Sequence, residues 1–389
     1  MKSYDADCVI VGAGCAGLSL ATAIIEQGLP SNAKILLLDS REQYTRDHNW
    51  CFFDARRHPF EAAVQHRFPR WAVRHSGRTI ERASSGMSYV HVPADRFYEI
   101  AQARIASSNK GAELRLGTDV SQLVETAQGV VVHTSRGEIR TKHVFDSRPL
   151  KTAKSPSHVH LLQHFLGHEI EADSPVFEPG VATLMDFDVD QSRGIHFIYV
   201  LPFTKTRALV ESTFFTESVL DESVYKEAIA RYMRERFRVS DYSVVDRERG
   251  VIPMTTQPFD AQPSAHVSRI GLAGGFAKPS TGYAFLASQR YAEEAARTFR
   301  RGGDLTAIGA RPTRSVFLDA VFLSFLKHHP EQAPSIFRRL FEKTAPDVLV
   351  RFLSEEGSRL DDLRVMKSLP TLAFMLETAK SAGSWKDAL

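Results

Sequence analysis

Residues 6–39 have the sequence ADCVIVGAGCAGLSLATAIIEQGLPSNAKILLLD, and this stretch determines the fold class. Residues 6–11 form a short apolar run of strand length, residues 17–27 show helical periodicity, and residues 34–39 form a second apolar run. Two strands connected through a helix lie parallel in one sheet. The stretch therefore predicts the first βαβ unit of an α/β protein.

A glycine-rich turn, Gly12-Ala13-Gly14-Cys15-Ala16-Gly17, joins the first strand to the helix. Gly12 permits the tight turn, Gly14 lets the backbone approach a pyrophosphate, and Gly17 allows the helix to pack closely on the strand. The start of the helix offers free N–H groups and a positive dipole end to phosphates. Asp39 ends the second strand, where a carboxylate can accept hydrogen bonds from the ribose of an adenosine. Together these features predict a dinucleotide site.

A second glycine cluster lies far downstream in residues 271–285, GLAGGFAKPSTGYAF. Its glycines allow the backbone to approach a ring system, Pro279 fixes the turn, and the following helix start favours negative charge on a reduced flavin. The first motif alone does not distinguish NAD from FAD, but its position near the amino terminus and this second cluster favour FAD. The alternative for the second cluster is an ordinary turn that enters a helix.

Arg96 opens a helix and is expected to reach the pyrophosphate, with a solvated surface arginine as the alternative. The predicted cofactor-binding residues are Gly12, Ala13, Gly14, Cys15, Ala16, Gly17, Asp39, Ser40, Arg96, Val120, Gly274, Pro279, Thr281, Gly282 and Tyr283.

The remaining pattern divides the chain into four parts. Residues 1–150 are predicted to form the first part of the FAD-binding domain, including β-hairpins, and residues 151–265 a substrate domain built on a mixed β-sheet. Residues 266–310 return to the FAD-binding domain, and residues 311–389 are predicted to be helical. Within the first part, residues 47–89 are rich in Arg, His and aromatic side chains and show no dominant period, so we expect mixed structure packed near the βαβ unit.

Composition excludes several classes of protein. Of the 389 residues, 43% are hydrophobic and 24% are charged, the balance of a globular chain rather than a disordered, collagenous or disulfide-stapled one. Lys and Arg number 49 against 46 Asp and Glu, a net charge of +3 that requires no nucleic acid partner. Cys8, Cys15 and Cys51 lack metal-ligand spacing, and no metal is predicted. No signal peptide and no run of about 18 apolar residues is visible, so a cytoplasmic location is expected.

Further blocks extend over almost the whole chain: DHNWCFF at residues 47–53, VFDSRP, FLGHEIE, LMDFDVDQSRGIHFIYVLPF, ALVESTFF, RERGVIPM, KPSTGY, FLDAVFL and SIFRRLF. In order and spacing, these blocks resemble the bacterial flavin-dependent lycopene β-cyclases, which look like remote relatives of aromatic-hydroxylase and geranylgeranyl-reductase flavoproteins. There are two departures. The hydroxylases usually carry a Gly-Asp pair where this chain has Gly274-Gly275. The cyclases often show a histidine and two threonines where it has Ala277, Lys278, Ser280 and Thr281.

The resemblance implies a fold, an activity and cofactors. The fold is a Rossmann-type FAD-binding domain of the aromatic hydroxylase/geranylgeranyl reductase type, with a mixed β-sheet substrate domain and a helical C-terminal region. The activity is a redox-neutral cyclisation of lycopene: a terminal double bond is protonated, a neighbouring alkene attacks the tertiary cation, and loss of a ring proton gives a β-ionone ring. Reduced FAD would stabilise the cation, and NAD(P)H would serve as the reductant that keeps the flavin reduced.

Glu211, in LVESTFF, is the predicted proton donor. It lies among apolar and aromatic residues on a predicted strand, and burial raises a carboxyl pKa and keeps the group protonated near neutrality. The alternative is a solvent-facing or arginine-paired strand residue. Trp50, Phe52 and Phe53 are predicted to line the polyene pocket, with plain core packing as the alternative.

Two other features leave alternatives open. Asp186, Asp188 and Asp190 alternate along LMDFDVDQ, which predicts a solvent-facing strand edge rather than a metal site because no His or Cys accompanies them. The C-terminal helices mix Phe and Leu with Lys and Arg, a composition expected of a chain that lies peripherally on the inner face of the cytoplasmic membrane and equally of a solvated helical cap.

Other functions remain open at this stage. A monooxygenase, halogenase or prenyl reductase would share the nucleotide motif, and a non-catalytic flavin or carotenoid carrier would bind pigment without turnover. Product mass distinguishes them, because a cyclase leaves the mass of its substrate unchanged. The sequence does not indicate whether one or both polyene ends react, nor the oligomeric state.

Overall fold

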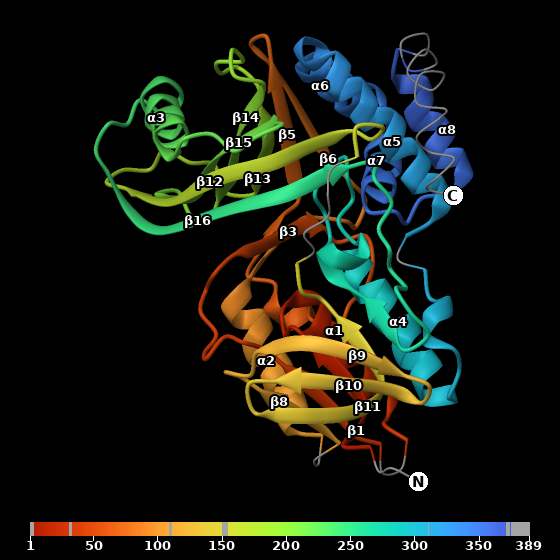
Figure 1. Ribbon diagram of the computed structural model, residues 1–389. Helices are drawn as coiled ribbons and strands as arrows, with labels where there is room; N and C mark the ends of the chain where they lie inside the picture. Colours follow the sequence, from red (N-terminus) through yellow and green to blue (C-terminus); the bar gives the residue numbers. More distant parts are fainter. Residues whose placement is uncertain are drawn as a thin grey trace.

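The computed structural model describes residues 4–30, 33–108, 111–149, 155–309 and 311–370, together with Phe374. Two β-rich parts lie one above the other, and a helical region stands beside the upper part (Figure 1). The predicted fold class, α/β with a second sheet and C-terminal helices, is confirmed.

The lower part is built on the predicted βαβ unit. Strand β1 (Ala6–Val11) continues through α1 (Cys15–Gln27) into β2 (Ile35–Leu38), and the two strands pair in parallel. The sheet has the order β8-β2-β1-β11-β10-β9, with β17 added beside β11. Its other strands are β8 (Ala112–Arg115), β9 (Val120–Thr126), β10 (Gly129–Thr134), β11 (Gly137–Asp146) and β17 (Val267–Arg269).

Three helices bury one face of this sheet. Helix α1 packs between α2 (Ala94–Ala106) and α4 (Phe285–Arg301), and all three contribute side chains to one apolar cluster. Helix α4 comes from more than two hundred residues downstream, and the parallel pairing of β17 with β11 anchors its approach. This return of the chain brings the second glycine cluster beside the first.

The upper sheet includes strands from outside residues 151–265, the range predicted for the substrate domain. Its order is β16-β12-β15-β14-β13-β5-β6, so the β5–β6 hairpin inside residues 47–89 belongs to it rather than to the first unit. Trp71 and Val73 of β5 are buried in the apolar cluster that the other strands of this sheet share with the C-terminal helices, which explains the placement of the hairpin. The strands are β5 (Arg70–His75), β6 (Arg78–Ala83), β12 (His160–Ala172), β13 (Val181–Asp186), β14 (Ile195–Pro202), β15 (Arg207–Thr216) and β16 (Tyr242–Thr255).

Helices cover both faces of the upper sheet. Helix α3 (Glu222–Tyr232), extended by a π-helical turn η2 (Met233–Phe237), packs on one face, where Val210 and Phe214 of β15 point. The C-terminal helices cover part of the other face (Figure 1). They are α5 (Thr313–His328), α6 (Ala333–Lys343), α7 (Pro346–Leu353) and α8 (Arg359–Ser368). In the described ranges, no helix combines the length and the apolar character needed to cross a membrane.

A small third sheet lies between the two parts. Its order is β3-β7-β4, with β3 (Asn49–Phe53), β7 (Tyr89–Pro93) and β4 (His66–Phe68) all antiparallel. The short 3-10 helices are η1 (Glu61–Ala63), η3 (Gly271–Gly274), η4 (Leu305–Ala307) and η5 (Pro330–Gln332).

Candidate active site

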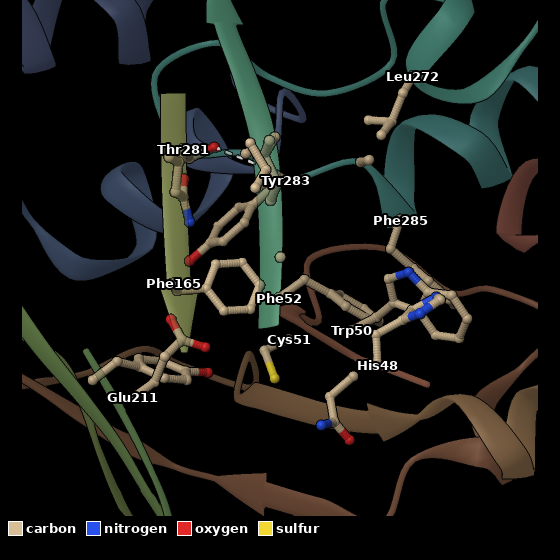
Figure 2. A pocket seen from close by; sticks show the side chains of 18 of the residues that line it. His48, Trp50, Cys51, Phe52, Phe165, Glu211, Leu272, Thr281, Tyr283 and Phe285 are labelled. Atoms are coloured by element: carbon tan, nitrogen blue, oxygen red, sulfur yellow. Dashed lines mark hydrogen bonds between the residues drawn. The ribbon is translucent and has the colours of Figure 1, made fainter. Parts of the chain in front are cut away.

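One cavity of about 560 Å³ connects the lower sheet, the small sheet, the upper sheet and the C-terminal helices. It extends from the first glycine turn, past β3 and the second glycine cluster, to β15, β16 and α6. Figure 2 shows Glu211 and Leu272 at opposite sides of this cavity, with Tyr283 between them. Most of its wall is apolar, which makes it suited to a hydrophobic ligand.

The nucleotide end of the cavity is formed by Gly14, Cys15 and Ala16 at the start of α1. A Cβ atom added to Gly14 would touch no protein atom within 4 Å, so the space in front of this residue is open. Helix α1 has no side-chain cap and no acidic residue in its first turn. Its first N–H groups therefore remain suited to phosphate oxygens, and the turn fits the predicted dinucleotide.

Gly12 and Gly17 serve the turn itself. Gly12 has a φ of 90°, and a Cβ atom on Gly17 would lie 2.1 Å from the Gly12 carbonyl oxygen, so only glycine fits either position. Asp39 is buried and accepts a 2.7 Å hydrogen bond from the backbone N–H of Ala13. The carboxylate predicted to bind ribose thus also fixes the glycine turn to the end of β2.

The second glycine cluster meets the first. Thr281, Gly282 and Tyr283 line the same cavity, as does Gly271, whose added Cβ atom would lie 3.2 Å from Cβ of Ala16. The two turns therefore lie against each other at Gly271 and Ala16, and the open space beside this contact is lined by both. Both clusters that the sequence singled out therefore face one space, which is the observation on which the fit to FAD rests.

The predicted cofactor-binding residues that do not line the cavity are Gly12, Ala13, Gly17, Asp39, Ser40, Arg96, Val120, Gly274 and Pro279. Gly274 is buried in η3, where an added Cβ atom would lie 2.3 Å from the carbonyl oxygen of Arg269, so its role is in local packing; Gly271 and Leu272 face the cavity instead. Arg96 is exposed in the first turn of α2, and its contact with a pyrophosphate stays a prediction, as do those of Ser40 and Val120.

Aromatic side chains form the wall between the two ends of the cavity. Trp50 and Phe52 line this cavity, and the Phe52 ring stacks on Phe285 at 4.5 Å between centroids (Figure 2). The prediction for Phe53 is wrong. This side chain is fully buried and packs against Trp71 and Tyr89, because β3 turns it away from the cavity into the core.

Glu211 lies on β15 and faces the cavity with 8% of its surface exposed. Along the strand, Glu211 alternates with Val210 and Ser212, which point to the α3 face, so its side chain is on the face that contains the cavity. Thr213 donates a hydrogen bond to Oε1 of Glu211. Burial raises the pKa of Glu211, and the nearby carboxyl group of Glu248 raises it further. The predicted environment of a protonated carboxyl is therefore present.

Three tyrosine hydroxyls lie close to Glu211. Tyr199, directly opposite Glu211 on β14, donates to the hydroxyl of Tyr89 at 3.2 Å, and Tyr283 donates to the same oxygen at 3.4 Å. Burial raises the pKa of all three hydroxyls, so they are neutral at physiological pH. They provide polarity without charge at this end of the cavity.

The prediction that the aspartates of LMDFDVDQ form a solvent-facing strand edge is wrong for Asp186, which is buried, whereas Asp188 and Asp190 are exposed but lie outside the strand. Strand β13 ends at Asp186, whose side chain is 1% exposed, accepts a 2.8 Å hydrogen bond from Tyr232 and lies 3.5 Å from Arg74. Asp188 and Asp190 follow the end of the strand. Alternation alone could not distinguish a buried, paired carboxylate from an exposed one.

The sequence analysis assigned no structural or chemical role to three further residues of this region. Glu248 and Tyr199 both line the cavity. Glu248 belongs to the RERGVIPM block, which contributed to the family resemblance but indicated no role for this residue. Lys278 of the second glycine cluster is 2% exposed and forms a 2.6 Å ion pair with Asp319 of α5. A lysine in a loop gives no signal of burial, and only the position of α5 reveals its partner.

Comparison with known proteins agrees with this architecture. The model of a family described as "Lycopene cyclase protein" matches residues 7–379. A lycopene beta-cyclase of Paracoccus sp. (strain N81106 / MBIC 01143) is 28% identical over 394 residues, covering 94% of each chain. One of Pantoea ananas is 28% identical over 290 residues, covering 71% of this chain and 70% of the relative. A geranylgeranyl bacteriochlorophyll reductase-like protein of Thermoplasma acidophilum shares the fold, with a TM-score of 0.61 at 12% identity and coverage of 98% of this chain and 99% of that one.

Proposed function

The chain belongs to the lycopene cyclase family, and we propose that it converts the acyclic end groups of lycopene to β-ionone rings by acid-initiated, redox-neutral chemistry with reduced FAD bound. The observation that carries this proposal is one continuous cavity that joins both glycine turns to a buried carboxyl group. An apolar end group placed against Glu211 would meet a proton donor in surroundings that exclude water.

The chain's own residues account for the steps of this reaction. The carboxyl proton of Glu211 passes to the terminal double bond, the neighbouring alkene closes the ring, and a ring proton leaves to a base. Trp50, Phe52 and Phe285 form an aromatic wall that keeps water from the cation. Gly14, Gly271 and Gly282 would hold the cofactor. When bound, reduced FAD supplies negative charge near the cation, with NAD(P)H as its external reductant.

Anaerobic incubation of the purified protein with lycopene, FAD and a reductant tests the proposal. We expect cyclic carotenoids that co-elute with β-ring standards and have the mass of the substrate. A product that has gained oxygen would identify a monooxygenase, and one that has gained hydrogen would identify a reductase. Pigment that binds and returns unchanged would identify a carrier.

Gly14 offers a test of the FAD site that does not require turnover. Because its backbone is extended (φ −87°, ψ −159°) and the space before it is empty, Gly14→Val leaves the fold intact and places a side chain in the cavity. We expect FAD to bind at least about tenfold more weakly, a loss of about 1.4 kcal/mol, while the melting temperature of the FAD-free protein is unchanged. Fluorescence titration measures the affinity, and equal affinity in the variant would place the dinucleotide elsewhere.

We also propose that the chain binds a membrane surface through α8, since lycopene is a membrane-dissolved substrate. The apolar faces of α5 and α6 are largely buried, but α8 exposes Leu360, Leu363 and Met366 beside Arg359 and Lys367. Apolar and basic side chains together suit an anionic lipid interface. Flotation with anionic liposomes should recover the chain, and Leu363→Asp should reduce the recovered fraction severalfold. Undiminished flotation of that variant would exclude α8.

A further inference from the structure

A second carboxylate, that of Glu248, lies on the same face of the upper sheet as Glu211. Gly167 of β12 lies directly opposite Glu211 on β15 and directly opposite Glu248 on β16, so all three residues project from one face. The two glutamates therefore stand on either side of a position that has no side chain. Both line the cavity.

The glycine between them makes their approach possible. A Cβ atom added to Gly167 would lie 3.1 Å from Cγ of Glu248 and 3.0 Å from Cδ1 of Leu209. The side chain of Glu248 therefore lies over β12 in the space that any other residue would fill. The charge of Glu248 raises the pKa of Glu211, because like charges in an apolar setting repel, so the two carboxyl groups do not readily ionise together.

Different hydrogen bonds distinguish the two carboxyls. Asn49 on β3 donates from Nδ2 to Oε2 of Glu248, which favours the ionised form of that group. The orientation of Asn49 is fixed by His91, whose Nε2 lies 2.7 Å from Oδ1 of Asn49. His91 is fully buried, and burial lowers its pKa to about 3, so the ring is neutral and its Nε2–H donates to Asn49. Asn49 is thereby held with its N–H group toward Glu248.

On this basis, which rests on the proposed cyclase function, we propose that Glu248 is a second catalytic residue: it shares one proton with Glu211 and accepts the ring proton in the last step. Glu211 loses its proton to the polyene, and the ionised Glu248 takes up the proton that leaves the ring. The pair thus still holds one proton at the end of a turnover. Transfer of that proton from Glu248 to Glu211 restores the starting state, so no oxidant or reductant is consumed.

Other titratable and charged groups face this pair from the surrounding elements. They are Cys51 and His48 near β3, Arg46 before it, Tyr199 of β14, Asp246 of β16, Tyr89 of β7 and Tyr283 of the second glycine cluster. Burial raises the pKa of Cys51, as it does those of the tyrosines, so these groups stay neutral while the carboxyls titrate. Burial raises the pKa of Glu248, and Asp246 raises it further, whereas Asn49, His48 and Arg46 favour its ionised form.

The test combines infrared titration of the FAD-loaded protein with kinetics. Without substrate, we expect the wild type to show a protonated carboxyl band at neutral pH that Glu211→Gln removes. In Glu248→Gln this band should remain but titrate at lower pH, because the negative charge of Glu248 is gone.

Kinetics with lycopene give the second measurement. Glu248→Gln should lower kcat by about 10²-fold or more with little change in KM, and Glu248→Asp should restore part of the lost kcat. Glu171→Gln, at the far end of β12, is the matched control and should change neither measurement.

Gly167→Ala is a second variant that retains both carboxyls. Its methyl group should displace Glu248 and move the titration in the same direction as Glu248→Gln. An unchanged titration and full kcat in Glu248→Gln would overturn the proposal. If the wild type forms no cyclic product, the proposed function and the base role of Glu248 fail together, whereas the shared proton is still confirmed or refuted by the infrared titration alone.

Discussion

Glu211→Gln should abolish cyclisation while flavin absorbance is retained. Glutamine has nearly the shape of the carboxyl group and can accept the hydrogen bond from Thr213, but it has no acidic proton to give. Positioned general acids typically contribute about 10²- to 10⁴-fold to a rate, so we expect a loss of kcat in this range. Chromatography of the carotenoid products measures it, and flavin absorbance shows that the site is still formed.

The proton-donor role of Glu211 also predicts the direction in which activity changes with pH. Burial raises the pKa of Glu211, and the protonated form is the active one. Activity should therefore fall as the pH rises through this raised pKa, because Glu211 then loses the proton that it donates. Glu171→Gln on β12 removes a carboxyl that lies outside the cavity and should retain wild-type activity. Full activity in Glu211→Gln would remove this residue from the mechanism.

Asp319→Asn should destabilise the protein strongly. Asp319 is 2% exposed, pairs with Lys278 at 2.6 Å, accepts a 2.6 Å hydrogen bond from Ser280 and contacts Arg311. Burial alone would raise the pKa of Asp319, but the charges of Lys278 and Arg311 hold it below its usual value. Removing the carboxylate leaves the buried Lys278 without its anion and leaves Arg311 with Glu355 alone. Breaking a buried ion pair in this way typically costs about 3–5 kcal/mol.

Chemical or thermal unfolding measures this loss. The variant should also bind FAD more weakly, because Lys278 and Ser280 belong to the second glycine cluster and Asp319 fixes that cluster to α5. Lys142→Gln is the control, since its 2.6 Å pair with Asp7 is solvent-exposed and such pairs contribute about 0–1 kcal/mol. A small change in Asp319→Asn, no larger than the change in the control, would show that the buried network is not needed.

The first glycine turn could be predicted in detail because its determinants are local. A strand, three glycines and a helix start lie within one short stretch. Each glycine meets a local requirement of the backbone, namely a tight turn, an open approach or close helix–strand packing. The glycines of residues 271–285 indicated a second approach to the same cofactor, but not the path by which the chain returns to this turn. No local pattern reveals that β17 pairs with β11 and carries α4 against α1.

The parts of the site that sequence reasoning missed depend on neighbours across the sheets. Phe53 is an aromatic residue next to Phe52, as a pocket residue could be, but the pleat of β3 directs its side chain into the core beside Trp71. Glu248 gained a role only when the register placed it and Glu211 on either side of Gly167. A glycine within a strand is a signal of close approach, yet the sequence does not say what approaches.

The most direct test of proton donation by a buried carboxyl is cyclisation carried out in heavy water. Between turnovers the proton that Glu211 and Glu248 share exchanges with solvent, so each ring formed should carry one deuterium, and the product should otherwise have the mass of lycopene. Mass spectrometry of the purified carotenoid reads this out. A cyclic product without deuterium, or a product that has gained oxygen or two hydrogen atoms, would contradict the account.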